Sequence, residues 1–311
     1  MTTITRAIGL FEALPGATRG IVWMVFATFC YAVLYAVVKH LSHDLHTIQI
    51  VFFRSALGVL FMLPWLVRAG LGALKTDRHG AYWVRSGLNY IGMVMLMWGI
   101  GNLALQDVTA LMYTGPLFTV VFVALILGEK VGPARALALA VGFSGALIIV
   151  RPGIIPISLA AIAIVSTSAC YALCNVVTKS LGRSEDTNKI VFYVFLQMLI
   201  IGMGPAIYVW KTPALELWGW IVAMGVLSSL ATQGVTRALV AADASLVMPF
   251  NFLKLPFAVV LGFAFWNEFP DLWTGIGAAV IFASTYYIAR REAAARAAEK
   301  AAEAAKPVRP V

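Results

Sequence analysis

The residue of greatest chemical interest in this sequence is Lys254, which lies in the middle of the apolar stretch 245–266. About 20 apolar residues can cross a bilayer, where a lysine costs roughly 2.5–3.5 kcal/mol on insertion scales. Such a lysine should face a protein-lined or wet cavity, where its ammonium group can bind an anion. Asn251 precedes it by three residues and can add hydrogen bonds. The alternative is a packing helix whose lysine bridges to a neighbour.

Prolines mark where the helices around this site should be interrupted. Pro249 and Pro256 flank Lys254, and Pro116 occupies the corresponding segment of the first half of the chain. Each proline removes a backbone donor and crowds the preceding carbonyl groups. Within a bilayer, the freed carbonyls need partners in neighbouring helices, side chains or water. We therefore expect these three prolines to shape helices that move or bind.

Polar and aromatic side chains share helical faces in several apolar segments, at spacings of three and four residues. The candidates for the wall of a binding cavity are Tyr31, Tyr35, Tyr171, Asn175, Gln233 and Trp98. Hydrogen bonding between helices is the alternative role for each polar member. The deep charges, Arg54 and Lys254, are cationic, and the segments hold no central Asp or Glu. The positive sign of these buried charges favours a substrate with a carboxylate or another anion. Arg85 lies near a span end, and its long side chain could simply extend to the membrane surface.

Catalysis and cofactor binding have no support in the sequence. There is no P-loop, no H-E-x-x-H motif and no G-x-S-x-G motif. His40, His43 and His46 cluster in one loop, where a solvated polar loop is a simpler interpretation than a zinc site. Cys30, Cys170 and Cys174 lie in apolar segments, as packing residues do. We predict no enzyme activity, no cofactor, no bound metal and no nucleic-acid partner.

The composition identifies a helical membrane protein. Of 311 residues, 61% are hydrophobic and 12% are charged, against about 45–50% and about 25% in soluble domains. Ten apolar segments have about the length that a bilayer requires. We predict an all-α polytopic membrane protein with spans at 20–39, 47–67, 81–101, 108–127, 133–150, 156–178, 188–210, 217–238, 244–266 and 271–289.

Positive charges predict the orientation of these spans. With the N-terminus in the cytosol, sixteen of the 23 Lys and Arg residues fall in cytosolic segments and three on the opposite side. Cytosolic loops of membrane proteins carry such an excess. We therefore expect a multi-pass protein of the bacterial inner (plasma) membrane, with both termini cytosolic and the first span retained rather than cleaved as a signal.

The two halves of the chain resemble each other. Cys-Tyr-Ala at 30–32 with Lys39 recurs at 170–172 with Lys179, and Glu129 corresponds to Glu268. Five spans per half is an odd number, so the halves must be inverted repeats, an arrangement typical of secondary transporters. Glu129 and Glu268 should cap or gate the ends of spans four and nine. The predicted parts are a cytosolic segment 1–19, repeats 20–151 and 156–290, and a cytosolic Ala/Glu/Lys-rich tail 291–311.

These motifs resemble a known family. Pro116-Leu-Phe with Leu127-Gly128-Glu129, and Asp243-Ala-Ser-Leu-Val with Lys254-Leu-Pro-Phe and Asn267-Glu268, are similar to the EamA repeat of the drug/metabolite transporter superfamily. Within it, the chain looks most like YddG-type bacterial amino-acid exporters. The resemblance implies export of amino acids, aromatic or other neutral ones, by alternating access. The alternative is uptake or exchange of another anionic or zwitterionic metabolite, such as a nucleoside derivative, a vitamin or S-adenosylmethionine. We expect a small-molecule substrate, the lipid bilayer as surroundings, and a monomer, with a dimer as the alternative.

Overall fold

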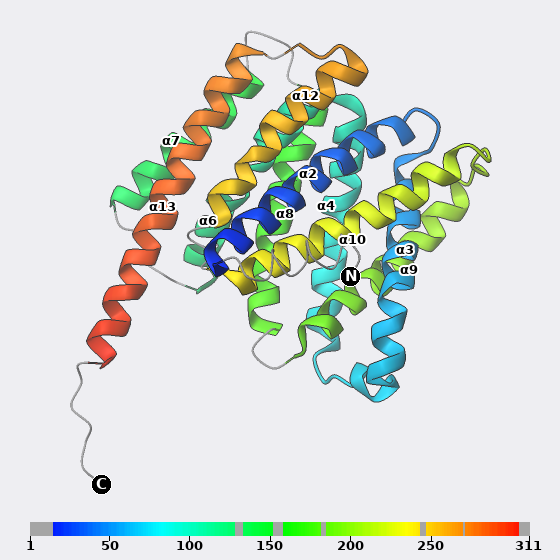
Figure 1. Cartoon of the computed structure of the whole chain (residues 1–311), viewed down its shortest axis with the longest axis horizontal. Coiled ribbons are helices and arrows are strands. Elements are labelled where there is room, and N and C mark those ends of the chain that lie inside the picture. Colours follow the sequence, from blue (N-terminus) through cyan, green and yellow to red (C-terminus); the bar gives the residue numbers. More distant parts are fainter. Residues whose placement is uncertain are drawn as a thin grey trace, which may run out of the picture.

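The computed structural model describes residues 15–127, 133–151, 158–181, 185–242, 247–269 and 271–304. Helices make up the described elements, which confirms the predicted all-α fold class (Figure 1). In the first half these are α2 (Gly16–Leu41), α3 (Thr47–Ala69), η1 (Leu71–Leu74), α4 (His79–Asn102), α5 (Leu105–Met112), α6 (Gly115–Leu127) and α7 (Pro133–Val150). The second half holds α8 (Leu159–Leu181), α9 (Thr187–Tyr208), α10 (Leu217–Ala241), η2 (Met248–Leu253), α12 (Lys254–Trp266) and α13 (Leu272–Ala304).

The helices follow the ten predicted ranges, with two ranges split into pieces. Among the described residues, five stretches are long and apolar enough to cross a membrane, and three further apolar helices are shorter. This makes the protein a multi-pass membrane protein, with ten as an approximate number of spans. The last helix also runs beyond its predicted end, because the Ala-, Glu- and Arg-rich sequence after residue 290 continues the helix to Ala304.

Spans four and nine are the split ranges. Span four consists of α5 and α6, separated by a turn at Tyr113 and Thr114. Span nine consists of η2 followed directly by α12. The C-cap of α12 is Asn267 in the left-handed conformation, with φ 52°. Glycine and asparagine tolerate this conformation best, which is compatible with Asn267 at the position that corresponds in sequence to Gly128 of the first repeat.

The packing of the helices repeats itself between the two halves. The helix α2 packs along α10. The repeat counterparts of these two helices are α8 and α4, and α8 packs along α4 in the same way. The counterparts α3 and α9 pack on each other, as do α7 and α13 (Figure 1). A two-fold axis between the halves produces this exchange of partners. The structure thus has the two-repeat architecture that the sequence predicted.

Close approach of α7 and α13 depends on glycine. A Cβ atom on Gly145 would lie 2.8 Å from the carbonyl oxygen of Gly277, and one on Gly277 would lie 2.6 Å from the carbonyl oxygen of Gly145. No larger residue fits either position without movement of the backbone. Small residues allow membrane helices to pack this closely. These glycines therefore serve packing within one chain.

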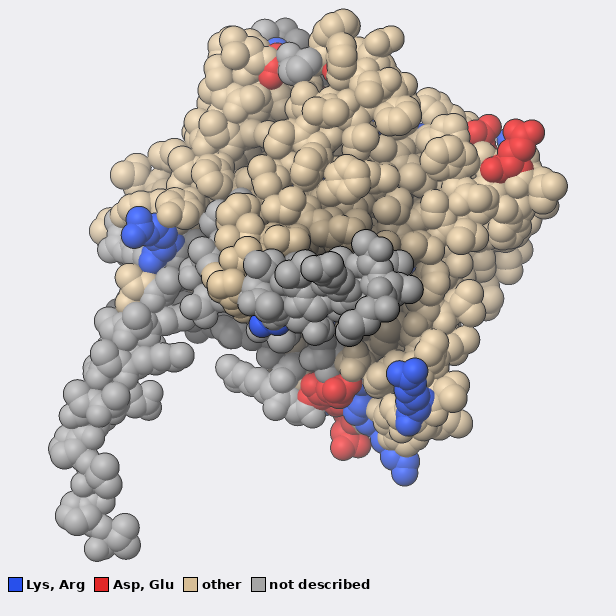
Figure 2. Space-filling view, viewed as in Figure 1, with Lys and Arg blue, Asp and Glu red and all other residues tan. Residues whose placement is uncertain are grey.

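The outer surface suits lipid. In Figure 2, charged side chains gather near the ends of the visible face, and a broad area between them carries neither sign. Many large apolar side chains are exposed, among them Phe29, Leu60, Val226 and Phe265. In water such a surface would aggregate, whereas in a bilayer it contacts acyl chains.

Candidate functional site

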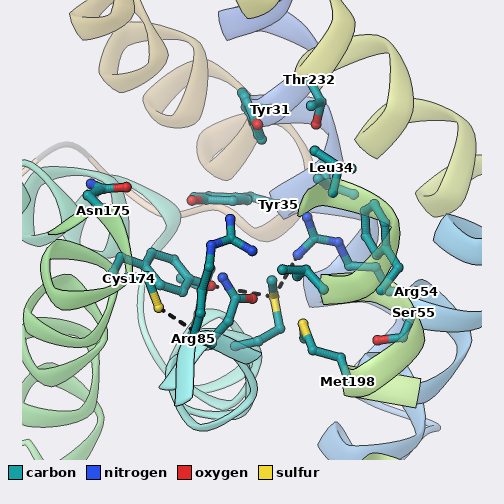
Figure 3. A pocket seen from close by; sticks show the side chains of 17 residues that line it. Tyr31, Leu34, Tyr35, Arg54, Ser55, Arg85, Cys174, Asn175, Met198 and Thr232 are labelled. Atoms are coloured by element: carbon teal, nitrogen blue, oxygen red, sulfur yellow. Dashed lines mark hydrogen bonds between the residues drawn. The ribbon is translucent and has the colours of Figure 1, made fainter. Parts of the chain in front are cut away.

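A cavity of about 420 Å³ lies among six helices, three from each repeat. This volume is within the range of small-molecule sites, about 300–1,000 Å³. Its lining combines guanidinium, amide and hydroxyl groups with aromatic and aliphatic side chains (Figure 3). The lining residues are Tyr31, Leu34, Tyr35, Arg54, Ser55, Arg85, Asn89, Met93, Leu96, Tyr171, Cys174, Asn175, Val191, Val194, Phe195, Met198 and Thr232.

Arg54 enters the cavity from α3 and is held in place by neighbouring helices. Its Nε and Nη2 atoms donate to the Ser228 hydroxyl of α10, at 3.2 and 3.0 Å. Its Nη1 atom lies 2.6 Å from the sulfur of Met93 on α4, which also accepts from the Tyr171 hydroxyl at 3.6 Å. Arg54 has no acidic partner among the described residues. The guanidinium group is therefore oriented but not neutralised.

Arg85 enters from α4 and keeps one hydrogen-bond donor free. Its Nε atom donates to the Thr178 hydroxyl of α8 at 2.6 Å. Its Nη1 atom is buried and has no hydrogen-bond partner in the described structure. Figure 3 shows Arg54 and Arg85 extending from opposite walls toward the ring of Tyr35. An unpaired guanidinium nitrogen beside a cavity is suited to an oxygen of a bound ligand.

Lys254 lies next to the cavity rather than in its lining. It is 8% exposed, and its Nζ atom lies 5.1 Å from the ring centroid of Tyr35 and 5.9 Å from that of Tyr31. A third ring, that of Tyr113, is 5.7 Å away. Such distances are within the range of cation–π attraction. Tyr31 and Tyr35 thus contact the cavity and also Lys254.

The structure brings together four of the six predicted wall residues and leaves two of them, as well as Asn251, apart. Tyr31, Tyr35, Tyr171 and Asn175 line the cavity, and their contact with a substrate stays a prediction. Three other predicted residues do not belong to the lining. Gln233 is exposed on α10, Trp98 is half-buried on α4, and Asn251 lies in η2, where its carbonyl group is 3.4 Å from the Tyr113 hydroxyl.

The predicted helix-breaking residues lie at the two interruptions. Pro116 is the second residue of α6, directly after the turn that separates it from α5. Pro249 falls in η2, and Pro256 falls in the first turn of α12. Glu268 follows α12 and pairs with Lys39 of α2. Glu129 lies outside the described residues.

One cavity residue, Arg85, was underestimated from the sequence. Arg85 was expected to extend toward the membrane surface, but its side chain points into the cavity. The signal was available, because Arg85 and Asn89 are four residues apart on one helical face and both line the cavity. An intramembrane charge is by default a candidate for function. Depth within the span was a misleading criterion, since a long side chain can reach inward from a helix end.

An all-helical membrane bundle with two repeats, interrupted helices and a polar cavity between the repeats defines a transporter of the secondary type. The family comparison agrees with this class. Residues 18–151 and 158–290 each match the EamA-like transporter family, and the chain belongs to that family.

Relatives with assigned names are also transporters. A riboflavin transporter from Rhizobium johnstonii is 32% identical over 89% of this chain and 92% of its own length. A pseudopaline exporter from Pseudomonas aeruginosa is 30% identical over 87% of this chain and 96% of its own. An S-adenosylmethionine uptake transporter from Rickettsia prowazekii is 24% identical over 89% and 94%. A solved crystal structure with 15% identity shares the fold, with a TM-score of 0.60 over 88% of this chain and 98% of its own.

Proposed function

We propose that this chain is a secondary transporter whose cavity binds a metabolite that combines a planar ring with oxygen acceptors. The observation that carries the proposal is the entry of Arg54 and Arg85 into one cavity without an acidic partner among the described residues. A cation away from water is unfavourable unless it is paired and hydrogen-bonded. A substrate that brings oxygen atoms supplies the missing partners.

The ring follows from the remaining lining. Tyr31, Tyr35 and Tyr171 present aromatic surface, and Met93 and Met198 present polarisable sulfur. Aromatic pairs and sulfur–aromatic contacts each contribute about 0.5–1.5 kcal/mol beyond simple burial of area. Arginine also stacks on planar rings. A flat heterocycle with carbonyl groups can use both kinds of contact at once.

Riboflavin is the first substrate to test. It has a planar ring system with carbonyl oxygens that can accept from guanidinium groups, and its hydroxylated chain can bond to side chains such as Asn175. Relatives named riboflavin transporters, including the one at 32% identity, support this choice. We expect the protein to reside in the inner membrane with both termini cytosolic, as the distribution of positive charge favours.

Amino-acid transport is the second candidate. A carboxylate would suit the free donor of Arg85, and an aromatic side chain would suit the tyrosines. The ammonium group of an amino acid, however, would find no acidic side chain among the described lining residues. The sequence predicted export, whereas the named relatives include both an exporter and an uptake carrier. Net direction in a carrier without an energy source of its own follows the substrate gradient.

Counterflow in proteoliposomes distinguishes the two candidates. Purified wild-type protein is reconstituted with unlabelled riboflavin or L-phenylalanine inside, and entry of the same labelled compound is measured. Riboflavin counterflow that Arg85→Met reduces at least about tenfold supports the proposal. Arg68→Met removes an exposed arginine of α3 and serves as the matched control. Counterflow of phenylalanine alone favours the amino-acid candidate, and counterflow of neither compound contradicts both.

A further inference from the structure

Lys254, which does not line the cavity, lies in an aromatic enclosure next to it. Three rings surround its ammonium group, those of Tyr31 and Tyr35 from α2 and Tyr113 from the turn between α5 and α6. We refer to these three residues as the tyrosine cage. No carboxylate among the described residues pairs with Lys254. Ring faces attract a cation, but the ammonium keeps three donors that a ring satisfies poorly.

The tyrosine cage lies where the interrupted helices of the two repeats meet. The Tyr113 hydroxyl donates to the carbonyl oxygen of Phe252 in η2 at 3.1 Å. Lys254 begins α12 directly after η2. The interruption in span four therefore touches the interruption in span nine. Interrupted helices near the bilayer midplane are where many secondary transporters bind their substrates.

The cavity and Lys254 share a wall. Tyr31 and Tyr35 line the cavity, and the same two rings lie within 6 Å of the Lys254 ammonium group. Tyr35 is 6% exposed, lines the cavity and lies 5.1 Å from the Lys254 ammonium group. A change in the rotamers of Tyr31 and Tyr35 would bring the cavity into contact with Lys254. A ligand held by Arg54 and Arg85 would then be adjacent to Lys254, a third cation without an acidic partner among the described residues.

We propose that Lys254 with its tyrosine cage is a second binding station for the acceptor group of the substrate, used during translocation rather than during initial binding. This inference rests on the proposed function. The ligand chemistry is a carboxylate or carbonyl oxygen, which forms a charge-assisted hydrogen bond stronger than the contacts the rings provide. The acceptor group of the substrate first binds Arg54 and Arg85. Movement of the Tyr31 and Tyr35 side chains then allows the same group to contact Lys254.

A purely structural role for Lys254 makes the opposite prediction for stability. If the contacts with the rings hold α12 against α2, replacement by the apolar and similarly long Met should lower the melting temperature. If Lys254 has no acidic partner until a ligand binds, Lys254→Met removes a buried cation from an apolar site. The melting temperature should then stay unchanged or rise. This readout needs no ligand.

The test compares four full-length proteins: wild type, Lys254→Met, Arg85→Met and the control Lys211→Met, which alters an exposed lysine before α10. Melting temperature, riboflavin affinity from its fluorescence, and riboflavin counterflow are measured for each. For Lys254→Met we expect a melting temperature no lower than wild type, an affinity within about threefold, and counterflow reduced at least about tenfold. For Arg85→Met we expect the affinity itself to fall.

Three results would overturn the second station: a clearly lower melting temperature in Lys254→Met, a loss of affinity as large as that of Arg85→Met, or counterflow equal to wild type. Failure of the proposed function is visible separately, because wild-type protein would then not bind riboflavin. L-phenylalanine replaces riboflavin as the probe in that case. If wild type carries neither compound, the second station is contradicted as well.

Discussion

Lys39 and Glu268 form a part-buried ion pair that joins the two repeats. Their side chains are 9% and 16% exposed, and the pair links α2 to the residue that follows α12. Lys39 also donates to the carbonyl oxygen of Leu103 at 2.7 Å, and Glu268 accepts from the backbone N–H of Leu105 at 2.9 Å. The pair therefore connects three segments at the end of the bundle that the charge distribution predicts to be extracellular.

Loss of this pair should open that end of the protein. Glu268→Gln removes the carboxylate that pairs with Lys39, which leaves a largely buried cation without an acidic partner and destabilises the closed arrangement. The measurement uses Leu34→Cys, a cavity residue, in a chain whose three native cysteines are replaced by Ala. In intact cells, labelling of this cysteine by an impermeant maleimide should rise about tenfold in Glu268→Gln.

Two further variants make the test of this pair specific. Asp271→Asn breaks the more exposed Arg151–Asp271 pair, which does not involve α2, and should leave labelling unchanged. The exchange Lys39→Glu with Glu268→Lys should not restore closure. The Leu103 carbonyl oxygen needs a donor at position 39, and the Leu105 N–H needs an acceptor at position 268. Equal labelling in wild type and Glu268→Gln would show that the pair does not close this end.

Ser228 should strengthen substrate binding by holding the Arg54 guanidinium group in its orientation. Its hydroxyl accepts two hydrogen bonds from that guanidinium group, and hydrogen bonds to charged groups contribute about 1.5–3 kcal/mol. Ser228→Ala should therefore weaken riboflavin binding about tenfold, as Arg54 loses its orientation. Ser229→Ala, one residue further along α10, should bind as wild type does. Equal affinities for both alanine variants would show that Ser228 does not affect substrate binding.

Arg85 should not be replaceable by lysine. Its Nε atom is occupied by Thr178 while Nη1 remains free, so one planar group serves the protein and the ligand together. A lysine keeps the charge but lacks this fork. We expect Arg85→Lys to lose at least about fivefold in riboflavin affinity, with Arg68→Lys unchanged. Full affinity in Arg85→Lys would mean that charge alone is recognised.

Acid should weaken the end of the bundle that carries η1. Hydrogen bonds from Lys189 and Thr76, 2.8 and 2.6 Å long, hold the pKa of the Glu185 carboxyl below its usual range. A lowered pKa adds stability above the unfolded pKa of about 4.3, and this stability is lost as the pH falls through the folded pKa. Between pH 7 and pH 3.5, the melting temperature of wild type should therefore fall about 1–2 °C further than that of Glu185→Gln. Parallel pH profiles would contradict this role.

Much of the fold could be predicted because membrane helices leave strong signals. Length and apolarity predicted the spans, and the matching Cys-Tyr-Ala and Lys positions predicted the repeat. The helix interruptions at Pro116 and around Lys254 could be predicted because proline has no backbone N–H to donate to a helical hydrogen bond. These features are local, so a single sequence contains them.

The cavity was predicted only in part because it depends on how helices rotate against one another. Tyr31 and Tyr35 both line the cavity, since two aromatic residues on one face of a buried helix point the same way. Gln233 was expected beside them but is exposed on α10. In apolar helices, periodicity shows which residues share a face but not whether that face meets lipid or protein. The orientations of the Arg54 and Arg85 side chains depend on Ser228, Met93 and Thr178, which are far away in the sequence.

The most direct test of the central claim is the affinity of the purified protein for riboflavin, measured by the quenching of riboflavin fluorescence. Wild type and the Arg68→Met control should bind with the same dissociation constant. The double variant Arg54→Met with Arg85→Met should bind at least about a hundredfold more weakly, since both guanidinium partners are removed. Equal affinity in the double variant, or no binding by wild type, would contradict the assignment of this cavity as the substrate site.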